Sequence, residues 1–164
     1  MSLALPIIIQ AEAPQKPEDI NSFIKAFVEL LTQHIQPNAK LLSNIKLILI
    51  EYCTNAIKHV TDEVNIIQAE LDKPILRLKK IDKAPKFKIG DLILSHDILL
   101  NYAFIELHRD SFQFILRDDK QQENINLIPE HFGFEIVIRA SEEFIYQYNK
   151  EDKTNVFCAS LTLN

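Results

Sequence analysis

The sequence predicts a single α+β domain, 1–164, folded as a two-layer sandwich with helices on one face of a mostly antiparallel sheet. Two long segments near the N-terminus, Glu18–Ile35 and Lys40–Val60, carry apolar residues at helical spacing. Runs of aromatic and β-branched residues separated by turns occupy the last third of the chain and favour antiparallel strands. A chain of 164 residues is long enough to bury one core.

The N-terminal third contains one expected strand followed by two expected helices. The apolar run Leu3–Ile9 predicts a strand. The segment Glu18–Ile35 predicts an amphipathic helix that ends before Pro37, and Lys40–Val60 predicts a second helix. No repeat or low-complexity linker separates these elements from the rest of the chain.

Residues 62–100 do not have one clear periodicity. Asp62–Leu71 is compatible with a continued helix that Pro74 would end, while Ile75–Ile81 and Asp91–Leu99 are ambiguous short elements. The remaining segments have clearer patterns and predict a hairpin, a helix and two closing strands: Tyr102–His108, Ser111–Arg117, Gly133–Glu142, Phe144–Tyr148 and Thr154–Leu163.

Composition restricts the class of protein. The hydrophobic content of 47% and the charged content of 25% are typical of soluble globular domains, and no apolar segment approaches the length of a membrane span. The net charge of −5 argues against a dedicated nucleic-acid binder. The two cysteines form neither a disulfide framework nor a zinc motif, which suits a reducing compartment. We therefore expect a cytoplasmic protein that binds neither membranes nor nucleic acid.

The charge is unevenly distributed along the chain. Seven basic residues and one acid lie between Lys73 and Lys88, which gives this segment +6 and leaves −11 elsewhere. Two interpretations remain open. The segment is either a solvated face whose lysine stems cover apolar residues, or a docking patch for an acidic partner.

The segment Lys40–Val60 carries a narrow polar line. At 100° per residue, Glu51, Asn55, Lys58 and His59 fall on one side of the helix, opposite its apolar arc. Because Leu47 and Ile48 border this line, it is expected to face a pocket or a partner. The alternative interpretation is an exposed helix edge.

The stretch Glu51-Tyr-Cys-Thr-Asn55-Ala-Ile-Lys58-His59 resembles the N-box of the GHKL ATPases, E-x-x-x-N-A-x-x-H. The resemblance is greatest to the branch of anti-sigma-factor serine kinases, whose chain also begins with a strand and an amphipathic helix. The C-terminal pattern of a glycine-initiated helix, a strand and a threonine-initiated strand is similar too. The resemblance covers about 1–60 and 102–164, which leaves 62–100 as an insert, and implies the GHKL (Bergerat-type) fold.

The resemblance implies roles for the N-box residues. Asn55 would be the Mg²⁺ ligand of a bound Mg-ATP, supplying its amide oxygen, and Glu51 would be the catalytic base that accepts a proton from water or a serine hydroxyl. Lys58 and His59 would lie beside the phosphates.

Three further residues would belong to the nucleotide site by the same resemblance. Asp118 would accept a hydrogen bond from the adenine amino group, Thr154 would support that contact, and Gly133 would belong to the second glycine motif. Each also has a plain structural interpretation: a turn at Asp118, a helix entry at Gly133 and a strand residue at Thr154.

The glycine motifs depart from the family pattern. The family has D-x-G-x-G where this chain has Asp118-Asp-Lys120-Gln-Gln122, and His131-Phe-Gly133-Phe keeps one glycine. A Cβ at such positions hinders close approach of the backbone to a base. Three hypotheses follow: a regulatory domain that binds a sigma factor or an anti-sigma antagonist with reduced or lost ATP binding, an active Mg-ATP-dependent serine kinase and anti-sigma factor, or an unrelated α+β domain. Members of the family are often dimeric, so a homodimer is also considered.

Overall fold

The computed structural model describes residues 5–59, 64–87, 102–116 and 132–163. Within these ranges the chain is α+β, with a seven-stranded antiparallel sheet, three helices and a short 3₁₀ turn. The elements in chain order are β1 (Ile7–Glu12), η1 (Pro17–Asp19), α1 (Ile20–Thr32), α2 (Ala39–Lys58), β2 (Ile66–Asp72), β3 (Ile75–Asp82), β4 (Tyr102–His108), β5 (Ser111–Leu116), α4 (Phe132–Ala140), β6 (Glu143–Asn149) and β7 (Thr154–Thr162).

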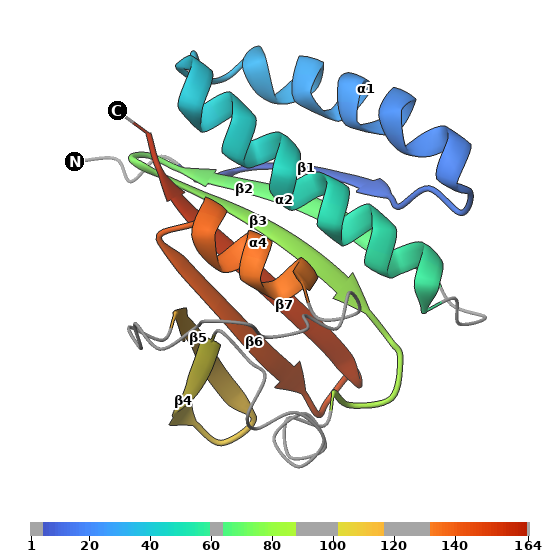
Figure 1. The fold of residues 1–164 in the computed structure, drawn as a ribbon, viewed down its shortest axis with the longest axis vertical. Helices are drawn as coiled ribbons and strands as arrows, with labels where there is room; N and C mark the ends of the chain where they lie inside the picture. Colours follow the sequence, from blue (N-terminus) through green and yellow to red (C-terminus); the bar gives the residue numbers. More distant parts are fainter. Residues whose placement is uncertain (1–4, 60–63, 88–101, 117–131, 164) are drawn as a thin grey trace, which may run out of the picture.

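The strands lie in the order β1-β2-β3-β7-β6-β5-β4, and every neighbouring pair is antiparallel (Figure 1). The order departs from the chain order at one place, where β3 pairs with the C-terminal strand β7. This pairing aligns Leu78 with Ala159 and Asp82 with Asn155. The end of β3 and the start of β7 therefore lie side by side in the middle of the sheet.

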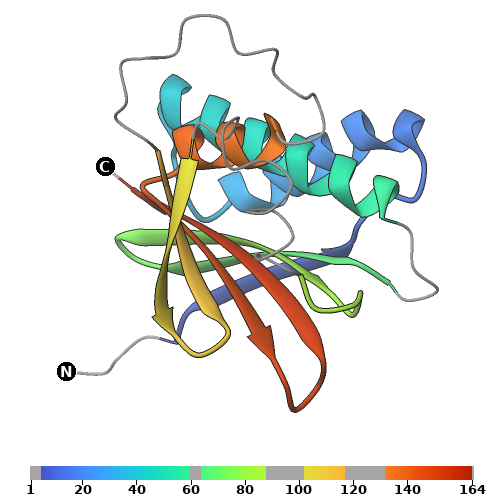
Figure 2. The ribbon, with the colours of Figure 1, turned by 60° about the horizontal axis from the view of Figure 1, so that its bottom comes forward.

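Alternating residues of the central strands are buried. Ile67, Ala69 and Leu71 of β2 lie in the core, while the residues between them are half-buried. α2 packs on β2 and β3, and α4 packs on β5 and β6. In Figure 2 these helices lie above the sheet. This arrangement brings α2 and α4 into direct contact over the middle strands.

Helix α2 follows from local sequence signals. The Asn38 side chain caps its N-terminus by accepting a hydrogen bond from the backbone N–H of Leu41 at 2.9 Å. Ile45, Leu49 and Tyr52 are fully or almost fully buried, and each such side chain stabilises the fold by about 1.5–3 kcal/mol. The Tyr52 hydroxyl also donates to the Leu78 carbonyl at 3.4 Å, which ties α2 to β3.

Most of the predicted elements are confirmed. The two N-terminal helices, the hairpin, the third helix and the two closing strands occur within a few residues of the expected positions. The first strand begins and ends later than expected, at Ile7 and Glu12. Arg117 and Asp91–Leu99, parts of two predicted elements, lie outside the described residues.

A helix over Asp62–Leu71 is wrong, because residues 66–72 form strand β2. Local propensity is weak evidence here, since Gln68, Ala69 and Glu70 favour helices but pair along their whole length with β1 and β3. The segment 66–82, which the sequence assigned to an insert, supplies β2 and β3, and both strands lie inside the sheet.

Among the described residues, no helix combines the length and the apolar character that a membrane crossing requires.

Candidate functional site

The predicted polar line on α2 divides into two parts. Glu51 and Asn55 are half-buried, whereas Lys58 and His59 are exposed at the C-terminal end of the helix. The backbone N–H of His59 donates to the Asn55 carbonyl at 3.1 Å and closes the helix. Only the first two residues of the line are therefore enclosed by other parts of the protein.

Glu51 and Asn55 face the N-terminal turn of α4. A Cβ added at Gly133 would lie 2.7 Å from the Glu51 Oε2 atom and 3.6 Å from the Asn55 Nδ2 atom. The first distance is shorter than a normal van der Waals contact, so a larger residue at position 133 would displace the Glu51 carboxylate from this placement. The structure thus brings together three of the predicted site residues: Glu51, Asn55 and Gly133.

The environment of Glu51 shifts the pKa of its carboxyl group upward. Burial raises its pKa above the usual value, and the nearby Lys58 ammonium acts in the opposite direction to a smaller extent. The partial positive charge at the N-terminus of α4 acts in the same direction as Lys58, because it stabilises a carboxylate near Gly133. Half-buried carboxyl groups with raised pKa values are common at functional sites, and their burial lowers the stability of the folded protein.

Thr154 begins strand β7 and is buried. Its hydroxyl donates to the Asp152 carboxylate at 2.7 Å, so it stabilises the turn that enters the strand. Asp118, its expected partner, lies outside the described residues. The acidic residue that the structure places beside the start of β7 is Asp82.

Asp82 was missed as a candidate site residue. It ends strand β3 opposite Asn155 and is 6% exposed. Its Oδ1 atom accepts from the Asn155 amide at 2.9 Å and from the Ala84 backbone N–H at 3.1 Å, and its Oδ2 atom pairs with the buried Lys80 ammonium. The available sequence signal was its place directly after the short element Ile75–Ile81, which the sequence left ambiguous.

Residues 84–87, which we call the strap, cross the start of β7 after β3 ends. The Asn155 amide donates to the Ala84 carbonyl at 2.8 Å, and its Oδ1 atom accepts from the Phe87 N–H at 3.2 Å. The Tyr146 hydroxyl accepts from the same N–H at 3.1 Å. One buried carboxamide therefore joins Asp82, the strap and β6.

The Phe87 ring lies among three other aromatic rings. Its centroid is 5.5 Å from that of Phe134 on α4, 5.4 Å from that of Tyr146 and 5.8 Å from that of Phe157, each in an edge-on arrangement. The Lys80 ammonium lies 5.4 Å from the Phe157 centroid. The space between the ends of β3 and β7 and the helix α4 is thus filled by side chains of the protein itself.

The polar and aromatic groups around Asp82 are occupied by contacts within the protein. The Asp82 carboxylate already binds Lys80, Ala84 and Asn155, and the Phe87 ring occupies the aromatic space beside it. At the N-terminal turn of α4, the Glu51 carboxylate takes up the space that a Cβ at position 133 would need. Across the described ranges, no group of three or more histidine, cysteine or acidic side chains is placed to hold a metal ion.

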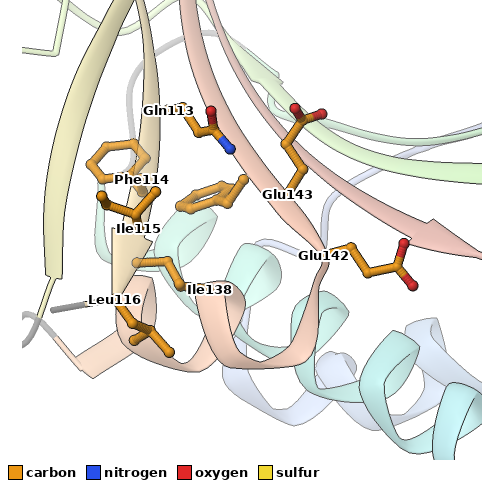
Figure 3. A pocket seen from close by; sticks show the side chains of 8 residues that line it. Gln113, Phe114, Ile115, Leu116, Ile138, Glu142 and Glu143 are labelled. Carbon is orange, nitrogen blue, oxygen red and sulfur yellow. The ribbon is translucent and has the colours of Figure 1, made fainter. Parts of the chain in front are cut away.

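A pocket of about 220 Å³ lies elsewhere, between β5 and the C-terminal end of α4 (Figure 3). The aliphatic side chains of Ile115, Leu116 and Ile138 gather at one end of it, and Glu142 and Glu143 stand at the other. The Glu142 carboxylate accepts from the hydroxyl and the N–H of Thr162. None of the predicted site residues lines this pocket.

Four of the seven basic residues of the run form ion pairs in the folded chain. Arg77 and Lys79 both pair with Glu70 on the sheet, Lys80 pairs with Asp82, and Lys86 pairs with Asp110. The paired residues are therefore not free to bind an acidic partner, which argues against the docking-patch interpretation for this part of the run.

No protein-family model matches the sequence, and a search of curated proteins finds no relative. The resemblance to the GHKL ATPases therefore stays a prediction that depends on the N-box residues and on the placement of the elements around them.

Proposed function

We propose that the chain is a regulatory, protein-binding domain of the GHKL type, similar to anti-sigma-factor serine kinases, that works in the cytoplasm without ATP. In this proposal the α+β fold is the two-layer GHKL sandwich, with α1, α2 and α4 on one face of the sheet. The observation that carries it is the filled space around Asp82, where Phe87 and Lys80 occupy what would be a nucleotide-base site.

The position of Asp82 supports the GHKL part of the proposal. In the family pattern, an aspartate at a strand end and the threonine that begins the last strand lie together beside adenine. Asp82 ends β3 and faces Asn155, the residue after Thr154. Asp82 fits this position, which the sequence pattern had assigned to Asp118.

The surroundings of Asp82 support the loss of nucleotide binding. The chain continues with Lys83, Ala84 and Pro85, so the glycines of the D-x-G-x-G pattern are absent at this aspartate as well. The Asp82 carboxylate is neutralised by Lys80, whereas a site for the adenine amino group requires a free acceptor.

A thermal shift measurement tests this proposal. A ligand specific for the folded state stabilises it by about 2.7 kcal/mol at 100 times its Kd. We expect millimolar Mg-ATP to leave the melting temperature of the wild type unchanged. A shift that Asn55→Ala abolishes, together with γ-phosphate transfer to a partner serine that Glu51→Ala abolishes, would replace the proposal with the active serine kinase.

The protein-binding part has its own measurement. The purified chain, free of nucleotide, is expected to form a stable complex with a sigma factor or with an anti-sigma antagonist in size-exclusion chromatography with light scattering. The same run reports whether the chain alone is a homodimer. If the chain forms no complex with either class of partner, the protein-binding part of the proposal is refuted.

A further inference from the structure

We propose that the strap is an internally bound ligand, and that the surface beneath it is a peptide-binding site for a basic residue followed by an aromatic residue. The inference deepens the proposed function, because it gives the chemistry of the partner segment that a protein-binding domain of this fold would hold. The strap residues are Ala84, Pro85, Lys86 and Phe87.

The first argument is recognition of the strap backbone by side chains. The Asn155 amide donates to the Ala84 carbonyl at 2.8 Å and lies 3.4 Å from the Pro85 carbonyl, and its oxygen accepts from the Phe87 N–H. Asn155 is 2% exposed, so these hydrogen bonds replace contacts with water that it has lost. A buried carboxamide that hydrogen-bonds to both the N–H donors and the carbonyl acceptors of a backbone is suited to binding a peptide.

The second argument is the aromatic subsite. Phe87 inserts between the rings of Phe134, Tyr146 and Phe157, with centroid distances of 5.4–5.8 Å. Edge-on aromatic pairs at these distances are favourable beyond the area that they bury. This subsite therefore discriminates an aromatic side chain from an aliphatic one.

The third argument is the cationic subsite next to it. The Lys86 ammonium pairs with the Asp110 carboxylate and lies 5.6 Å from the centroid of the Tyr148 ring. Lys150 pairs with the other oxygen of Asp110 at 2.9 Å, and together the two ammonium groups lower the pKa of Asp110 to about 2. This carboxylate stays ionised in the physiological range and so favours a basic side chain.

The contacts of the strap come from distant parts of the chain. Its backbone partners, Tyr146 and Asn155, are 59 to 71 residues away in sequence, and the strap itself belongs to no strand. Recognition through side chains, without strand pairing, makes the strap replaceable by a second segment of the same chemistry. A segment of a partner protein must displace the strap before it can bind. The apparent affinity of the wild type for that segment is therefore lowered in proportion to the small fraction of molecules in which the strap has left the site.

The test uses the full chain with the Phe87→Ala substitution and the synthetic peptide Lys-Ala-Pro-Lys-Phe-Lys, blocked at both ends. We expect fluorescence anisotropy of the labelled peptide to show binding to the variant roughly tenfold or more tighter than to the wild type, because the strap no longer competes. Two matched peptides serve as controls, one with alanine in place of phenylalanine and one with glutamate in place of the central lysine. Both are expected to bind the variant more weakly.

Stability gives a second measurement on the same samples. The peptide should raise the melting temperature of Phe87→Ala and leave the wild type nearly unchanged. If the variant is unfolded in isolation, recovery of its near-ultraviolet circular dichroism at millimolar peptide supports the inference. No recovery, equal binding to wild type and variant, or equal binding of all three peptides would overturn it.

Neither measurement involves nucleotide or a sigma factor. A melting shift of the wild type with Mg-ATP would refute the proposed function and leave the peptide result to be judged separately. Failure of the peptide to bind would refute the inference and leave the proposed function standing.

Discussion

Replacement of Asn155 by alanine tests the buried network on which the site depends. The Asn155 side chain donates to the Asp82 carboxylate and the Ala84 carbonyl, and it accepts from the Tyr146 hydroxyl at 2.8 Å and from the Phe87 N–H. Alanine lacks the carboxamide, so all of these hydrogen bonds are lost together. The space that the side chain leaves is closed to solvent, since Asn155 is 2% exposed.

The magnitude follows from which groups keep another partner. Asp82 keeps Lys80 and the Ala84 N–H, and the Phe87 N–H keeps the Tyr146 oxygen. The Ala84 carbonyl loses its bond, and the Tyr146 hydroxyl loses its acceptor. Each buried group left without a partner costs about 1–3 kcal/mol, so the free energy of unfolding should fall by roughly 2–6 kcal/mol. At about 2–4 °C per kcal/mol for a chain of this length, the melting temperature should fall by at least ~4 °C.

Differential scanning fluorimetry and urea unfolding measure the loss, with Asn149→Ala as the matched control. Asn149 is on the neighbouring strand, and its side chain accepts an exposed hydrogen bond from the Glu151 N–H at 3.1 Å. Because water can replace this bond, the control should cost less than about 1 kcal/mol. If Asn155→Ala and Asn149→Ala melt within about 2 °C of each other, the buried network does not contribute as argued.

Three further predictions concern the charged residues and the glycine. Glu51→Gln should raise the melting temperature at pH 7. Burial raises the Glu51 pKa in the folded state, so the wild type loses stability as the pH rises from 4.5 through the folded-state pKa, and glutamine avoids this loss. An identical gain at every pH would contradict this reasoning. Gly133→Ala should destabilise less in a Glu51→Ala background than in the wild type, with a coupling of about 0.5–3 kcal/mol in the double-mutant cycle, whereas additive effects would separate the two residues. The Asp110 pKa of about 2 is lowered mainly by Lys86 and then by Lys150, so its stabilisation is complete above pH ~4 and is lost as the pH falls through 2. Asp110→Asn should flatten acid unfolding in that range, and an unchanged profile would argue against the ion pairs.

Sequence periodicity was sufficient for elements whose patterns are local. The amphipathic helices α1 and α2 and the closing strands β6 and β7 follow from the spacing of their own apolar residues. The same reasoning failed at β2. There Gln68 and Glu70 carry helix propensity, but hydrogen bonding to β1 and β3 decides the conformation.

The candidate site shows the same division. Glu51 and Asn55 could be selected from the sequence, because positions four residues apart share one face of any helix. That Glu51 meets Gly133 depends on how α2 and α4 pack, which no local pattern encodes. That Asp82 lies beside Asn155 depends on the register of β3 against β7.

The helical faces and the strand alternation of this protein were therefore set by the order of its side chains along the chain, since each depends on neighbours a few residues away. The pairing of Asp82 with Asn155, the insertion of Phe87 and the contact at Gly133 were decided by the tertiary structure. The physical reason is that these contacts join residues far apart in the chain, from Phe87 with Phe134 to Gly133 with Glu51. The free energy that selects them comes from packing and buried hydrogen bonds across the sheet.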